Sequence, residues 1–263
     1  ASSTATDWMA LAMGRFGYSD DAYVYMIDDG TGYTDYLAAM RTYIEQTYAA
    51  NNGVLHSVKA TEWHRAVVAI AALGGDPTDF GTYNGQPINL IADGIYDRGR
   101  TTSLGRQGLN GWIWGLIALD SLRYEIPDGA FYSRDEILLE ILRRQLPDGV
   151  ALSGSTADPD MTAMALQALA PYYNSEKSYV YVQKARGETV TKTVRQVADE
   201  AIDCLSALQL DTGDFTSWGT ENVESTDQVT VALCSLGIDP LTDPRFIKNG
   251  NTLLDGILRY RMA

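Results

Sequence analysis

Tryptophans and acids recur near the starts of apolar stretches, and together these residue types could bind a ligand. The tryptophans are Trp8, Trp63, Trp112 and Trp218. The acids are Asp7, Glu62, Asp160 and Asp227. Aromatic walls with a few polar groups are typical of concave ligand sites. If these starts meet at one mouth, the sequence predicts a ligand site formed by Trp8, Glu62, Trp63, His64, Trp112, Asp160, Trp218 and Asp227. The alternative is a tryptophan layer that plugs the narrow end of a barrel.

Carboxylates in the same set could also do chemistry. A pair such as Glu62 and Asp160, if about 5–10 Å apart, could hydrolyse a glycosidic bond. The competing interpretation is that Asp158-Pro159-Asp160 caps a helix, where carboxylates meet free N–H groups and the positive end of the dipole.

Metal chemistry has few candidate ligands. A zinc site using His56, Glu62 and His64 is conceivable, but a turn histidine and a helix-start histidine explain the two imidazoles more simply. The sequence therefore predicts neither a metal nor a cofactor.

Five apolar helices must position these residues. An apolar stretch with almost no polar side is buried all round. If Asp7, Glu62, Gly111, Asp160 and Thr226 are taken as equivalent, the stretches recur at spacings of 55, 49, 49 and 66 residues. This recurrence is an internal repeat, and repeats decide the fold before local detail does.

One-sided helices alternate with the apolar ones. They are predicted at about 34–50, 133–146, 193–209 and 249–261, and a β-hairpin insertion is expected near 178–192. Five to six helix pairs set side by side predict an all-α fold, an α/α toroid with the apolar helices inside. An open solenoid is the alternative, but it would leave one side of the apolar helices wet.

Two of the repeats are recognisable copies. Leu73-Gly74-Gly75-Asp76-Pro77 matches Leu236-Gly237-Ile238-Asp239-Pro240, and Asn84-Gly85 is echoed by Asn249-Gly250. Glycine takes the left-handed position after a helix, and Asp-Pro opens the next turn.

Composition bounds the function. The 263 residues are 45% hydrophobic, and the repeat runs from end to end without a linker, which predicts one folded domain. The formal charge of -14 argues against nucleic-acid binding. We expect no membrane insertion and a monomer. The chain opens at Ala1-Ser2-Ser3, which suggests an excised domain or a processed protein.

The repeats resemble those of the prenyltransferase and squalene-oxidase group, whose fold is the α/α toroid. Three stretches carry the resemblance: the segment from Asp158 to Ala163, the paired Leu-Gly-x-Asp-Pro endings, and the turn from Gly213 to Gly219. The chain looks still more similar to uncharacterised extracellular repeat domains of Gram-positive gut bacteria. That resemblance implies a location outside the cell or in the bacterial cell wall.

The resemblance also limits the chemistry. Class II terpenoid cyclases protonate substrate with an Asp-x-Asp-Asp-Thr-Ala motif; Asp158, Asp160 and Thr162 match it, but Met161 replaces the third acid. The zinc ligands of protein prenyltransferases are not matched. We therefore predict a non-enzymatic module that binds a small molecule, peptide or glycan. The alternative is a degenerate cyclase or polysaccharide-active enzyme with Asp160 as its acid, aided by Asp158 or Glu62.

Overall fold

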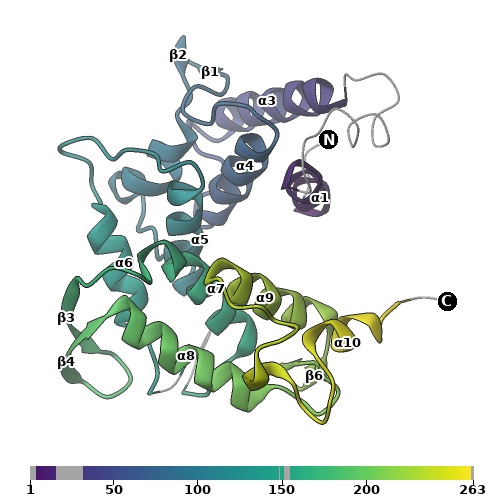
Figure 1. Cartoon of the computed structure of the whole chain (residues 1–263). Helices are drawn as coiled ribbons and strands as arrows, with labels where there is room; N and C mark the ends of the chain where they lie inside the picture. Colours follow the sequence, from purple (N-terminus) through teal and green to yellow (C-terminus); the bar gives the residue numbers. More distant parts are fainter. Residues whose placement is uncertain (1–3, 16–31, 148, 151–154, 262–263) are drawn as a thin grey trace. The chain divides into compact units, whose positions relative to one another are not determined.

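The structure, a computed structural model, describes residues 4–15, 32–147, 149–150 and 155–261. Contacts divide the chain into two compact units, Ala1–Arg134 and Asp135–Ala263. Helices make up about half of the chain, and the strands of the described part form two-stranded hairpins (Figure 1). The mostly helical class is therefore confirmed, whereas the single domain stays a prediction.

The first unit is built around one buried helix. Its helices are α1 (Thr4–Arg15), α3 (Gly32–Ala50), α4 (Thr61–Ala72), η1 (Ala92–Tyr96), η2 (Arg98–Arg100) and α5 (Leu109–Asp120), and its hairpin pairs β1 (Thr82–Tyr83) with β2 (Gln86–Pro87). Helices α1, α5 and η1 all pack against α4. As the apolar pattern predicts, α4 is buried on nearly every side, with Trp63, Val67 and Ile70 fully enclosed.

A glycine lets η1 approach α4 closely. A Cβ atom added to Gly94 would lie 2.3 Å from the Cβ of Trp63, so a larger residue would push the two helices apart. The glycine of the Asp93-Gly94-Ile95 sequence is thus required by packing at this position.

The second unit contains a longer series of helices. They are α6 (Arg134–Leu142), α7 (Pro159–Leu169), η3 (Ala170–Tyr172), α8 (Val194–Leu208), α9 (Val223–Ser235), η4 (Pro244–Phe246) and α10 (Leu253–Leu258). Two hairpins join them, β3 (Ser178–Gln183) with β4 (Glu188–Thr193) and β5 (Thr216–Ser217) with β6 (Thr220–Glu221). Helix α7 packs against α8 and α9, and α9 packs against α10.

Side-chain caps define where the helices of the second unit begin. Asp158 accepts the Met161 N–H at the start of α7, and Asn222 accepts the Ser225 N–H at the start of α9. Thr193 begins α8 with a capping box, in which the cap and the third residue bond each other's backbone. Each cap contributes about 1 kcal/mol by satisfying an N–H that has no partner within the helix.

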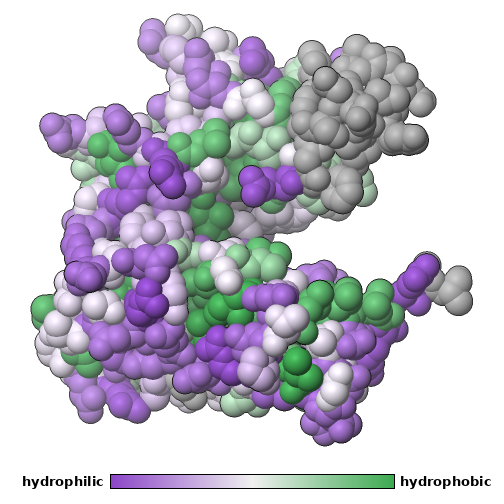
Figure 2. All heavy atoms as spheres, viewed as in Figure 1, coloured by the Kyte–Doolittle hydropathy of each residue, from purple (hydrophilic) through white to green (hydrophobic). Residues whose placement is uncertain are grey.

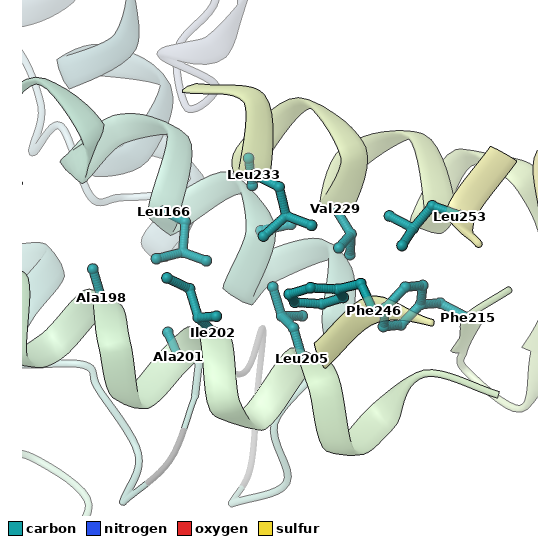
Figure 3. Close-up of a cluster of buried hydrophobic side chains, with 12 residues drawn as sticks. Leu166, Ala198, Ala201, Ile202, Leu205, Phe215, Val229, Leu233, Phe246 and Leu253 are labelled. Atoms are coloured by element: carbon teal, nitrogen blue, oxygen red, sulfur yellow. The ribbon is translucent and has the colours of Figure 1, made fainter. Parts of the chain in front are cut away.

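The core of the second unit lies between α7, α8, α9 and α10 (Figure 3). Its labelled side chains include Leu166, Ile202, Leu205, Phe215, Val229, Leu233, Phe246 and Leu253, all essentially unexposed. Burying each one stabilises the fold by about 1.5–3 kcal/mol. Helix α8 contributes only one side to this core, which confirms the one-sided pattern predicted for 193–209.

The hairpin expected near 178–192 is confirmed as β3 and β4. Its register pairs Tyr181 with Val190 and Gln183 with Glu188. Along β3 the residues alternate between exposed and buried, so Tyr179, Tyr181 and Gln183 face inward while Val180 and Val182 face outward.

The last helix is shorter than predicted. Helix α10 spans only Leu253–Leu258, because Asn249-Gly250 forms a turn and Thr252 begins the helix with a capping box. Apolar atoms reach the surface over α10 (Figure 2), where Leu254 and Leu258 are 43% and 50% exposed.

Candidate functional site

An acidic and aromatic corner forms where α7 and α9 begin. We call it the Trp218 corner, and it consists of Asp158, Asp160, Ser217, Trp218 and Ser225. Packing of α7 against α9 and against β5 brings these elements together. Of the predicted site residues, Asp160 and Trp218 belong to this corner.

Asp158 connects α7 to the β5–β6 hairpin. One carboxylate oxygen accepts the Met161 N–H at 3.0 Å, and the other accepts the Ser217 hydroxyl at 2.7 Å. The predicted capping role of Asp158 is thus confirmed. Because both oxygens are engaged, this side chain holds the hairpin in place.

Asp160 keeps an unused acceptor. Its Oδ1 is buried without a hydrogen-bond partner among the described residues, while the nearby hydroxyls of Ser217 and Ser225 donate to Asp158 and Asn222. Burial raises the pKa of Asp160, and the charge of Asp158 raises it further, while the serine hydroxyls lower it. A buried acceptor without a donor is costly, so this oxygen favours a ligand group that donates a hydrogen bond.

Trp218 projects from the tip of the β5–β6 hairpin. Its side chain is 75% exposed, and the two turn residues Trp218 and Gly219 both have positive φ, 53° and 78°. The left-handed conformation is unusual for a bulky residue. Ser217, bonded to Asp158, directly precedes the tryptophan and ties the turn to the acids.

Two other turns of the chain show what normally occupies this position. Asn84-Gly85 joins β1 to β2 with φ of 51° and 74°, and Asn249-Gly250 lies in a turn with φ of 50° and 84°. Asn-Gly is the usual pair for such turns, because asparagine tolerates positive φ. Trp218 therefore stands where the same chain elsewhere uses asparagine.

Further acids lie next to the corner in the chain. Asp227, another predicted site residue, is exposed on α9, as is Glu224. Glu221 on β6 binds Arg259 at 2.8 Å, and Arg259 also lies 3.4 Å from the buried carboxylate of Asp214. Arg259 therefore already pairs with two carboxylates of this chain, those of Glu221 and Asp214.

Trp63 and His64, predicted as ligand contacts, are wholly buried in the first unit. The Trp63 indole donates to the Tyr48 hydroxyl at 2.7 Å, and the Arg98 guanidinium lies 4.3 Å over its ring. The His64 Nε2 bonds the Gly94 carbonyl at 2.9 Å, and burial lowers the His64 pKa to about 4. In this conformation both rings form part of the core.

Glu62 belongs to an ion-pair cluster that sequence reasoning missed. Arg65 binds Glu62 at 2.8 Å and Asp7 at 2.7 Å, linking α4 to α1. The cavity beside these residues measures about 10 Å³, room for one water molecule at most. The i, i+3 spacing of Glu62 and Arg65 was the available signal for this pair.

The other predicted tryptophans differ in exposure. Trp112 is buried and meets Tyr132 edge-on, with ring centroids 5.2 Å apart. Trp8 is half-buried, and its ring centroid lies 5.0 Å from that of Trp114. Whether any of the eight predicted residues contacts a ligand stays a prediction, but of the four tryptophans only Trp218 presents most of its surface to solvent.

The residues considered as metal ligands, His56, Glu62 and His64, make hydrogen bonds or ion pairs within the fold. His56 Nδ1 accepts the backbone N–H groups of Val58 and Lys59, each at 3.0 Å. Within the ranges that the structure describes, no three His, Cys, Asp or Glu side chains gather closely enough to hold a metal ion. None of the helices described there is long and apolar enough to cross a membrane.

Comparisons with known proteins give no family. No protein-family description, no curated protein and no solved structure matches this chain. The candidate function therefore rests on the site itself.

Proposed function

We propose that this chain is a non-enzymatic recognition module that binds an extended basic peptide at the Trp218 corner. The observation that carries the proposal is the exposed Trp218 in a left-handed turn position. Tryptophan is the residue type most enriched among the anchors that dominate binding energy.

The turn itself supports a role in binding. A left-handed conformation costs a residue with a Cβ roughly 1–2 kcal/mol, and asparagine bears this cost more easily. The chain uses Asn84 and Asn249 in the matching turns. Trp218 lowers local stability and exposes an indole. Both features are expected if the indole contacts a partner.

Charge favours a cationic partner over a neutral one. The chain carries a formal charge of -14. Asp160 and Glu224 lie in the first turns of α7 and α9, and Asp227 follows Glu224 in α9. A lysine or arginine side chain can stack on an indole face and donate to a carboxylate at the same time. Asp160 Oδ1 supplies the acceptor that such a donor needs.

Titration with a short polylysine peptide tests the proposal. Binding is followed by tryptophan fluorescence and by calorimetry. We expect Trp218→Asn to weaken binding about tenfold or more, with an unfolding temperature that is unchanged or higher. Phe131→Asn, which removes an exposed aromatic of the first unit, should leave binding unchanged.

Other outcomes would change the conclusion. Saturable binding of a neutral oligosaccharide that needs Trp218, without binding of polylysine, would keep the recognition role but overturn the basic-peptide class. If Trp218→Asn binds polylysine as tightly as the unaltered chain, the Trp218 corner is not the site.

An enzyme remains the second candidate, favoured by one observation. The raised pKa of Asp160 holds its carboxyl closer to the protonated form that a general acid needs. If the chain is such an enzyme, Asp160→Asn abolishes turnover of a polyprenyl or polysaccharide substrate. If it is a binding module, neither substrate is turned over at all.

We further propose the α/α toroid as the complete fold and the bacterial cell exterior as its location. Helix packing within each unit supports the toroid. The apolar helices, which alternate with one-sided helices along the chain, pack against one another. In the first unit α1 and α5 pack against α4, and in the second α7 packs against α9. The cell-surface location rests on the sequence resemblance.

A further inference from the structure

A polar cluster joins the segment after α6 to the β3–β4 hairpin and to α8, and it is buried at its glutamines and its tyrosine but partly exposed at Lys192 and Glu200. Its members are Gln145, Tyr181, Gln183, Lys192 and Glu200. Gln145, Tyr181 and Gln183 are each no more than 3% exposed. None of these residues belongs to the Trp218 corner, so the cluster is independent of the proposed binding function.

Glu200 brings an amine and an amide to the same carboxylate. The Lys192 Nζ lies 2.7 Å and 2.6 Å from its two oxygens, and the Gln145 Nε2 donates to Oε2 at 2.5 Å. The two nitrogens therefore share one acceptor atom. An amine must lose a proton before it can attack a carbonyl carbon, and an adjacent carboxylate is a base that can take it.

The amide carbonyl of Gln145 is held from the other side by two donors. The Tyr181 hydroxyl lies 3.3 Å and the Gln183 Nε2 3.2 Å from Gln145 Oε1. Burial raises the pKa of Tyr181, so its hydroxyl stays protonated and able to donate. Two donors directed at a buried carbonyl oxygen stabilise the negative charge that develops when its carbon is attacked.

We propose that Lys192 and Gln145 form an intramolecular amide bond, with Glu200 transferring the proton. Nζ of Lys192 attacks Cδ of Gln145, and the Tyr181 and Gln183 donors stabilise the tetrahedral oxyanion. Glu200 accepts a proton from the ammonium of Lys192 and passes it to the departing nitrogen of Gln145, and the second proton that Nζ loses after the attack follows the same route. The C–N bond to Nε2 breaks as the bond to Nζ forms, and the products are an amide crosslink and one ammonium ion. No oxidant, reductant or cofactor is needed.

The structural consequence is a covalent bond between the segment that follows α6 and the hairpin. Residues 145 and 192 are distant in sequence, so the crosslink closes a long loop and restricts the unfolded chain. The hairpin insertion would then be fixed to the helical core by a bond that resists unfolding.

Intact-mass spectrometry of the purified chain tests the proposal directly. We expect a mass lower than the sequence mass by one ammonia molecule, and a proteolytic fragment in which the peptides containing Gln145 and Lys192 are joined. Lys192→Arg and Glu200→Gln should both restore the mass calculated from their sequences. Lys184→Arg, which removes another hairpin lysine close to a glutamate, should keep the ammonia deficit.

Succinimide formation at an Asn-Gly pair also releases ammonia, and the same variants separate the two reactions. A succinimide deficit would persist in Lys192→Arg and map to one of the four Asn-Gly pairs, at Asn52, Asn84, Asn110 or Asn249. A full sequence mass in the unaltered chain, or a deficit that survives Lys192→Arg, would overturn the proposal. The contacts would then be an ordinary hydrogen-bond network.

Discussion

The His64 ring is enclosed within the first unit, next to a positive charge. Its Nε2 must carry the hydrogen, because its partner is the Gly94 carbonyl, and a carbonyl only accepts. Its Nδ1 has no hydrogen-bond partner among the described residues. Burial and then the Arg98 charge lower the His64 pKa, so the folded chain strongly prefers the neutral ring.

This preference predicts acid sensitivity. As pH falls, the unfolded chain binds a proton near 6.5, whereas the folded chain binds one only near 4. The His64 contribution is therefore complete above pH 6.5, is lost between 6.5 and 4, and amounts to about 3 kcal/mol. Urea unfolding across this range should show the decline.

His64→Gln is the control for that titration, since its amide can still donate to Gly94. We expect the variant to lose much less stability between pH 6.5 and 4. Asp93, whose pKa burial raises, acts in the opposite direction, so the difference between the two proteins is the quantity to compare. Parallel curves for both would show that His64 does not cause the decline.

At the scale of helices, α4 and α9 are matching copies with different neighbours. Aligning their Leu-Gly-x-Asp-Pro endings places Val68 against Val231 and His64 against Asp227. Val68 is 5% exposed, whereas Val231 is 50% exposed. The helices share an apolar pattern, but α4 packs against α1, α5 and η1, and α9 packs against α7 and α10.

Val68 and Val231 occupy equivalent positions and are the same residue type, so substituting each one tests how burial affects stability. Val68→Ala should lower the free energy of unfolding by about 2 kcal/mol, because it removes buried methyl groups and leaves a cavity. Val231→Ala should change it by less than about 0.5 kcal/mol, as exposed substitutions usually do. Chemical denaturation of both variants provides the comparison. Equal losses would mean that the α9 surface around Val231 is covered in solution.

For the whole molecule, the charge of -14 affects folding and binding in opposite ways. Like charges repel within the compact state, and salt screens that repulsion. We expect the unfolding temperature to rise as NaCl is increased to roughly 0.1–0.5 M. Over the same range polylysine should bind less tightly, because screening weakens attraction between opposite charges. Salt-independent affinity would indicate that the indole, without the acids, accounts for binding.

Local pattern predicted most of the elements. The cap at Asp158, the helical periodicities and the strand residues near 178–192 placed helices and hairpin close to where they lie. These signals are readable because each depends on residues within one or two turns of one another. The Asn249-Gly250 turn, between Lys248 and Asn251, was readable too, but its effect in shortening α10 was not anticipated.

What the sequence by itself determined is therefore where helices begin, where turns require positive φ, and which residues are apolar. Only the tertiary structure decided which equivalent positions are covered: Val68 is enclosed and Val231 exposed, and His64 is buried where Asp227 faces solvent. It also brought together Gln145, Lys192 and Glu200, which no spacing connects. The physical reason is that burial and side-chain contacts depend on elements far apart in the chain, whereas caps and turns depend on neighbours.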